Sequence, residues 1–147
     1  MIEKIINKKK LLAIIVRKKY RKKNGINFFT PNNLNLQCGF MKHKKNYVIK
    51  PHLHLKRVNK IFYTSETIIL LKGKLRIDFY DNRRKYLFSK ILYSSEIIVL
   101  ITGGHGFKTL NNCEMIEVKQ GPYSITKDKK KFDGITNNKI RIRGKIN

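Results

Sequence analysis

The sequence is poor in acidic residues, cysteine and alanine. Only 9 Asp and Glu accompany 34 Lys and Arg in 147 residues, which gives a formal charge of +25. The two cysteines, Cys38 and Cys113, are far apart and form no Cys-x-x-Cys motif, so the sequence predicts reduced thiols and excludes a disulfide scaffold. Ala13 is the single alanine, while Ile, Lys and Asn abound. Such a composition is what a genome biased toward A and T imposes on surface positions.

Long apolar runs are also missing. The run Leu11–Val16 is far shorter than the roughly 20 apolar residues of a membrane span. Arg17, Lys18 and Lys19 follow it, where an export signal needs a small-residue cleavage site. We therefore expect a buried strand here, no membrane partner and a cytoplasmic protein.

The basic residues are dispersed rather than concentrated on one segment. They occur in short runs at 8–10, 18–23, 42–45, 83–85 and 127–131. No RNA-binding motif with interleaved aromatic residues accompanies them. The sequence thus predicts no specific nucleic-acid partner, only weak and salt-sensitive binding driven by counterion release.

Alternating side chains indicate an all-β domain. Leu75, Ile77 and Phe79 would lie on one face of a strand, and the polar residues between them on the other. Gly73 between two such segments predicts a hairpin of 66–71 with 75–80. Several short strands at this spacing indicate a sandwich or barrel. We expect one domain over residues 1–132 and a flexible basic tail over 133–147.

Three histidines and one glutamate could form a metal site. In an extended segment, His52 and His54 would point to the same side. Glu66 lies seven residues before Gly73, and His105 is flanked by glycines. Imidazole and carboxylate ligands suit a divalent Fe, Mn, Ni, Co or Zn ion without choosing among them. Alternatively, His-x-His is a polar surface pair.

This pattern resembles the two short motifs of the cupin superfamily. The stretches from 11–15 to 117–123 resemble small bacterial cupins found among surface-polysaccharide and sugar-modifying genes. Two departures are the eleven residues between His54 and Glu66 and the missing proline near Ile101. The resemblance implies a double-stranded β-helix, or jelly-roll barrel, with an N-terminal strand extension, and metal ligands at His52, His54, Glu66 and His105.

A homodimer is expected as well. Cupins of this size commonly dimerise, as the resemblance implies. Residues 2–16 are apolar and have few evident local partners, so they could pair with the sheet of a neighbouring subunit.

The predicted function is metal-dependent isomerisation or epimerisation of a sugar or sugar nucleotide in surface-polysaccharide metabolism. Tyr63 and Tyr80 are the candidate catalytic residues, and Lys56, Arg57 and Arg76 the candidate substrate-binding residues. Each also has a structural explanation, for example as a core-edge tyrosine or a solvated loop cation. Two alternatives stay open: a metal-free isomerase in which a histidine such as His52 is the general base, and a non-catalytic sugar-binding or regulatory cupin.

Overall fold

The chain divides into two compact units. A computed structural model describes residues 1–122, 124 and 128–144. The first unit consists of Met1–Tyr20 with Tyr63–Asn147, and the second of Arg21–Phe62. The sequence predicted a single domain over residues 1–132.

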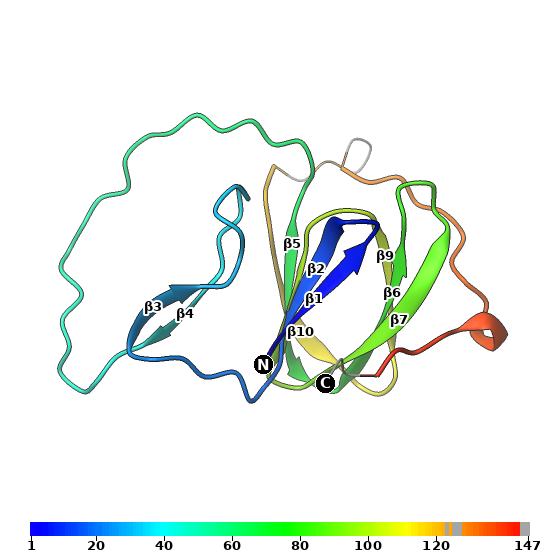
Figure 1. Cartoon of the computed structure of the whole chain (residues 1–147), viewed down its shortest axis with the longest axis horizontal. Helices are drawn as coiled ribbons and strands as arrows, with labels where there is room; N and C mark the ends of the chain where they lie inside the picture. Colours follow the sequence, from blue (N-terminus) through cyan, green and yellow to red (C-terminus); the bar gives the residue numbers. More distant parts are fainter. Residues whose placement is uncertain (123, 125–127, 145–147) are drawn as a thin grey trace. The chain divides into compact units, whose positions relative to one another are not determined.

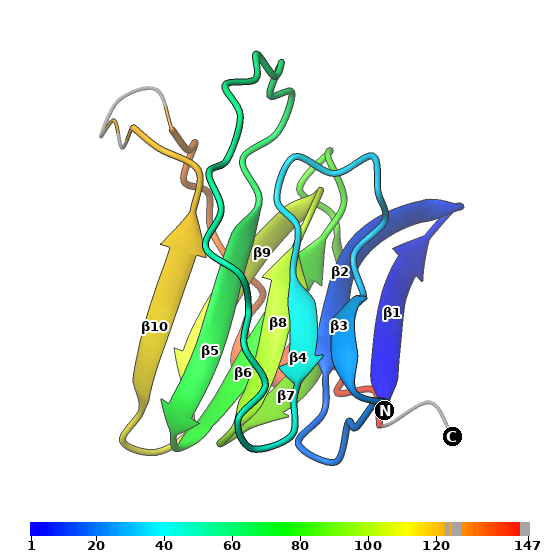
Figure 2. The ribbon, with the colours of Figure 1, turned by 90° about the vertical axis from the view of Figure 1, so that its left-hand side faces the viewer.

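The first unit contains two antiparallel sheets. One has five strands in the order β1-β2-β8-β5-β10, and the other three in the order β7-β6-β9. Figure 2 shows the five-stranded sheet in front of β6, β7 and β9. The strands are β1 Ile2–Asn7, β2 Lys10–Val16, β5 Glu66–Lys72, β6 Lys74–Tyr80, β7 Tyr86–Tyr93, β8 Glu96–Leu100, β9 Gly104–Thr109 and β10 Glu114–Lys119, and a 3-10 turn, η1, spans Asn137–Lys139. The prediction of an all-β fold is confirmed.

The core lies between the two sheets, which Figure 1 shows as two layers of strands. Alternation along β6 directs Leu75, Ile77 and Phe79 inward, as predicted, and all three are at most 1% exposed. They pack against Ile68 and Leu70 of β5 and further buried residues of β2 and β8. The run Leu11–Val16 forms most of β2 and is buried from Leu12 onward, as its apolar composition predicts.

The predicted hairpin around Gly73 is wrong, because β5 and β6 belong to different sheets. Gly73 has a φ of 97°, and a Cβ there would lie 2.4 Å from the carbonyl oxygen of Asn112. Such a position admits only glycine and lets the chain turn sharply from one sheet into the other. Alternation reveals which face of a strand is buried, but it does not reveal which strand is its neighbour.

The N-terminal segment finds its partners within the chain. β1 pairs with β2, and β2 pairs with β8, both antiparallel. The expectation that this segment has few local partners is therefore wrong. The homodimer itself stays a prediction.

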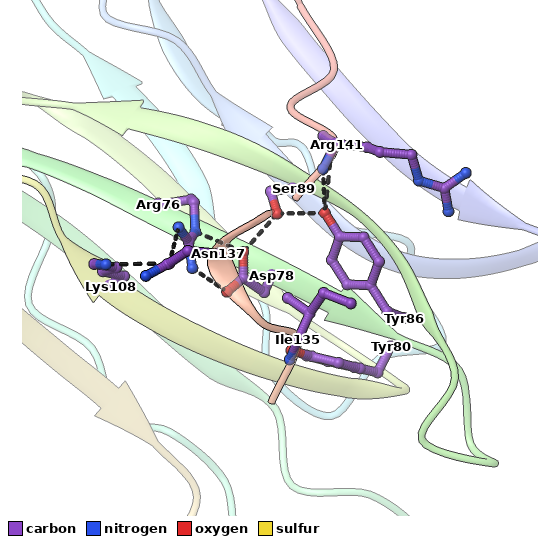
Figure 3. A network of polar contacts seen from close by, with 9 residues as sticks. All are labelled: Arg76, Asp78, Tyr80, Tyr86, Ser89, Lys108, Ile135, Asn137 and Arg141. Atoms are coloured by element: carbon purple, nitrogen blue, oxygen red, sulfur yellow. Dashed lines mark hydrogen bonds and ion pairs between the residues drawn. The ribbon is translucent and has the colours of Figure 1, made fainter. Parts of the chain in front are cut away.

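The C-terminal segment follows the outer face of the three-stranded sheet, where Figure 3 shows its contacts. Tyr80 and Tyr86 accept hydrogen bonds from the backbone amides of Ile135 and Arg141, each at 2.9 Å. The backbone of Ser89 also exchanges hydrogen bonds with Arg141 and Arg143, at 2.8 and 2.9 Å. The sequence predicted a flexible tail from residue 133, whereas the described part of it, up to Gly144, is bonded to β6 and β7.

The second unit is built on a two-stranded antiparallel sheet. β3 (Gly25–Phe28) pairs with β4 (Gly39–Lys42). The Thr30 hydroxyl accepts a hydrogen bond from the Cys38 amide at 3.0 Å and steadies the connecting loop. Residues 49–61 contain no strand. Within the described residues, no helix has the length and apolar character needed to cross a membrane.

Four charged side chains are buried between the sheets of the first unit. Arg17 binds Glu3 at 2.6 Å and Glu96 at 2.8 Å, and Lys90 pairs with Glu3. Burial raises the pKa of Glu3, but hydrogen bonds from Lys90 and Arg17 outweigh it and leave that pKa below its ordinary value. The cluster joins β1 and β8 of one sheet to β7 of the other.

We expect Lys90→Met to lower the free energy of unfolding by about 3 kcal/mol or more, because it leaves the buried Glu3 carboxylate with one cation fewer. The matched control is Lys72→Met, which removes the exposed Lys72–Glu114 pair, 3.4 Å long. This control should cost less than about 1 kcal/mol. Urea denaturation at pH 7 measures both, and equal losses would contradict the structural importance of the buried cluster.

Candidate functional site

His105 and Glu66 reach the same space from opposite sheets. In the pairing of β9 with β6, His105 lies opposite Phe79 and Phe107 opposite Ile77. Directly opposed residues share a face of the sheet, so His105 lies on the inner face, like Phe79. Glu66 begins β5, and by alternation it shares the inner face with Ile68 and Leu70.

The turn before β9 depends on Gly103. Its φ of 80° is unfavourable for other residues, and an added Cβ would lie 2.7 Å from the carbonyl oxygen of Tyr80. The turn therefore brings the chain close to the end of β6. This close approach fixes where β9 begins and hence where His105 points.

Glu66 and His105 form a direct hydrogen bond of 2.9 Å, from Nε2 of the ring to Oε2 of the carboxylate. The side chain of Glu66 is 12% exposed and that of His105 28% exposed. The hydrogen bond from His105 is the main cause that lowers the pKa of Glu66, while burial opposes it and the charges of His105, Lys119 and Lys129 assist. Glu66 is therefore ionised near neutral pH and orients the imidazole.

The remaining ring nitrogen of His105 is available. With Nε2 donating to Glu66, a neutral imidazole carries its lone pair on Nδ1. In the part of the chain that the structure describes, Nδ1 has no hydrogen-bond partner. It can accept a proton or coordinate a metal ion.

A cavity of about 630 Å³ surrounds this pair. Its size falls within the usual range of small-molecule sites. Carboxylates, lysines, aromatic rings and glycine backbone line it: Glu66, Tyr80, Gly103, Gly104, His105, Gly106, Phe107, Glu117, Asp128, Lys129, Lys130, Lys131, Phe132 and Gly134. Such a lining offers hydrogen bonds and charge together with apolar surface.

Two of the predicted site residues lie on β6 but have structural partners. Tyr80 lines the cavity, yet it is 4% exposed and its hydroxyl accepts the hydrogen bond from Ile135. Arg76 binds both carboxylate oxygens of Asp78 at 2.9 Å on the outer face of the sheet (Figure 3). Arg76 is not among the residues that line the cavity.

The other predicted helpers lie elsewhere. Tyr63 is 61% exposed and does not line the cavity around His105. Lys56 and Arg57 are exposed residues of the second unit. Arg57 lines a separate hollow with Leu53, His54 and Leu55.

His52 and His54 also belong to the second unit. Their segment has no strand, but the two rings are neighbours, with centroids 5.3 Å apart in an edge-on arrangement. Nδ1 of His52 lies 2.9 Å from the carbonyl oxygen of Lys50. That contact favours a proton on Nδ1 and leaves Nε2 able to bind a metal ion, as is usual for histidine ligands.

The donor types of the four predicted metal ligands suit a divalent ion. Glu66 and His105 are adjacent in the first unit, and His52 and His54 are adjacent in the second. Among residues 1–122, 124 and 128–144, no group of three or more His, Cys, Asp or Glu side chains that could hold a metal ion is present. The metal site stays a prediction.

Several residues of the cavity were not identified from the sequence. Lys119 does not itself line the cavity, but it pairs in register with Glu66 across β5 and β10, so alternation along β10 could have placed it beside the site. Its ammonium group forms an ion pair with Asp128. Phe132 and Gly134 give no comparable signal, because they precede no strand or motif and line the cavity through long-range contacts.

Comparison of the chain with protein-family models, curated proteins and solved structures finds no match. The chemistry of the site must therefore be inferred from its own residues.

We expect Glu66→Gln to reduce stability at pH 7 by on the order of 1 kcal/mol, because it weakens the bond to His105. Folding lowers the pKa of Glu66 from 4.5. The contribution of Glu66 is thus fully present above pH 4.5 and is lost as the pH falls through the lowered folded-state value.

Urea denaturation between pH 3 and 7 should show the curves of the wild type and Glu66→Gln converging at the acid end. Glu114→Gln, which removes an exposed carboxylate, is the control for the loss of one negative charge. A constant difference at every pH would contradict the assignment.

Proposed function

We propose that the chain is a cupin-type protein that isomerises or epimerises a keto-sugar, free or nucleotide-linked. The observation that carries this proposal is the His105–Glu66 pair in the 630 Å³ cavity. In the first unit, the connections β5–β6, β7–β8, β8–β9 and β9–β10 each pass from one sheet to the other. Such crossing is typical of a jelly roll and supports the cupin interpretation.

The pair suits proton abstraction next to a carbonyl group. Nδ1 of His105 would remove a proton from the carbon beside the sugar carbonyl, and Glu66 would stabilise the resulting imidazolium through Nε2. The electron pair of the broken C–H bond forms an enediolate. Return of the proton to the neighbouring carbon, with the hydroxyl proton passing from one oxygen of the enediolate to the other, gives isomerisation. Protonation of the same carbon from the opposite face, with solvent water as the proton donor, gives epimerisation, and His105 then releases its proton to solvent.

The lining also suits a sugar. Phe107 packs near His105, with ring centroids 5.3 Å apart, and offers a face to the apolar side of a pyranose. Glu117 and the backbone of Gly104 and Gly106 line the same cavity and offer hydrogen bonds to hydroxyl groups. Tyr80 contributes its ring to the lining, and its hydroxyl accepts a hydrogen bond from the amide of Ile135.

A divalent ion, if bound by His52, His54, Glu66 and His105, would polarise the carbonyl oxygen and favour the enediolate. The proposal for proton transfer and the proposal for the metal can be tested separately.

The first test follows proton exchange. The wild type is incubated in D2O with a panel of free, phosphorylated and nucleotide-linked keto-sugars, with and without EDTA, and deuterium incorporation is followed by NMR. We expect His105→Gln to reduce exchange by about 10²- to 10⁴-fold. His43→Gln is the control, because His43 stacks on Tyr47 and does not line the cavity.

The two outcomes separate the alternatives. Exchange that survives EDTA and requires His105 identifies the metal-free isomerase. Binding of a sugar without exchange in any member of the panel would contradict catalysis and leave the non-catalytic sugar-binding function.

The second test concerns the metal. We expect one divalent ion per chain in protein purified without a nickel column, with affinity falling at acid pH because histidine coordinates a metal ion only in its neutral form. His54→Ala should abolish stoichiometric metal, measured by mass spectrometry of the metal content, while His43→Ala should not. Undiminished metal in His54→Ala would refute the predicted ligand set.

A further inference from the structure

One wall of the His105 cavity is formed by residues 128–135, which we call the strap. The strap is fixed at both ends. Asp128 forms an ion pair with Lys119 of β10, and both side chains are at most 15% exposed. At the other end, the amide of Ile135 donates to the Tyr80 hydroxyl at 2.9 Å.

An aromatic contact holds the middle of the strap against the sheet. The ring of Phe132 packs edge-on against Tyr80, with centroids 5.1 Å apart. A Cβ on Gly104 would lie 3.0 Å from the tip of that ring, so the glycine provides the room for Phe132. The strap is thus built into the cavity wall by contacts with β6, β9 and β10.

Between these anchors the strap carries Lys129, Lys130 and Lys131, all of which line the cavity. Within the described residues, none of the three forms an ion pair with a carboxylate. The charge of Lys129 reaches the interior, because it helps to lower the pKa of Glu66.

The acidic residues of the cavity offset only part of this charge. Asp128 is paired with Lys119. Among the described residues of the lining, Glu66 and Glu117 are the carboxylates that are not paired with a lysine, and they stand against three lysines. The lysines therefore give the lining of this concave site an excess of positive charge, which attracts anions.

We propose that Lys129, Lys130 and Lys131 form an anion subsite of the His105 cavity that binds the phosphoryl or diphosphoryl group of a phosphorylated ligand. Three ammonium groups match the charge of a diphosphate better than that of a single carboxylate. Lysine binds phosphate as a point charge and needs no bidentate geometry. The subsite rests on the proposed function only in that it assigns the phosphoryl group to the ligand on which His105 acts.

The test uses inorganic pyrophosphate and isothermal titration calorimetry on the full chain, with EDTA present because pyrophosphate also binds divalent ions. We expect Lys129→Gln/Lys130→Gln/Lys131→Gln to weaken binding by about tenfold or more at physiological salt. The matched control is Lys8→Gln/Lys9→Gln/Lys10→Gln. It removes the same charge from three exposed lysines that do not line the cavity.

The control variant should bind pyrophosphate within about twofold of the wild type. Equal weakening in both triple variants would show a general effect of net charge and overturn the subsite. No binding of pyrophosphate to the wild type at physiological salt would overturn it as well. Circular dichroism and thermal unfolding confirm that the variants are folded.

Further titrations identify the chemical group. Glucose 1-phosphate and glucuronate compare a phosphoryl group with a carboxylate on the same sugar scaffold, and stronger binding of glucuronate would contradict a phosphoryl subsite. An oligonucleotide should bind only at low salt and be weakened equally by both triple variants. Sequence-dependent binding at physiological salt that requires the strap lysines would instead assign the strap to nucleic acid.

His105→Gln separates this inference from the proposed function. It should retain pyrophosphate affinity while losing proton exchange. If pyrophosphate binding fails but His105-dependent exchange persists, the subsite is wrong and the function stands. If pyrophosphate binds through the strap but no keto-sugar exchanges its proton, the anion subsite stands and the proposed isomerase or epimerase function is wrong.

Discussion

The register between β6 and β9 is the constraint on which the site depends. His105 faces the interior because it lies opposite Phe79, which is 1% exposed in the core. A shift of one residue would turn His105 outward and bring Gly104 or Gly106 to the inner face. Burial of Ile77 and Phe79 therefore fixes the direction of a polar side chain that contributes little to the core itself.

The same strand organises both of its faces. Inward, β6 contributes apolar residues to the core, and outward it presents Arg76, Asp78 and Tyr80, all at most 8% exposed. Asp78 binds Arg76 and Ser89, while Tyr80 binds the C-terminal segment (Figure 3). One strand thus contacts the core, sets the position of His105 and supports the wall of the cavity. A substitution on its outer face would therefore alter the geometry of the site.

Local patterns predicted the parts of the fold that local forces determine. The alternation of Leu75, Ile77 and Phe79 located a buried face, and the apolar run after Leu11 located a buried strand. Glu66 and His105 were selected by motif, and the structure places them 2.9 Å apart. The pairing of distant segments was harder to predict from the sequence. Neither the crossing between sheets at Gly73 nor the docking of residues 133–144 is marked by a periodic pattern of apolar residues.

Charge burial was equally hidden from the sequence. Lys90 lies on the inner face of β7 and is 1% exposed, although lysine is almost always a surface residue. Its burial is possible because it forms an ion pair with Glu3 of β1, which is far away in the sequence. In a sequence with so many lysines, nothing distinguishes this one until its partner is known. For the same reason, the three lysines of the strap could not be separated from those on ordinary surface positions.

The edge of β7, the outermost strand of the three-stranded sheet, bears on the solubility of the protein. β7 is bonded to β6 on one side, and on the other Ser89 forms a parallel bridge with Ile142. Strand edges with free amide and carbonyl groups are templates for the addition of strands from other molecules. The last described residues occupy part of this edge, which leaves fewer of its amide and carbonyl groups open to a strand of another molecule. A protease that removed them would expose the unpaired backbone groups of this edge while leaving His105 and Glu66 in place.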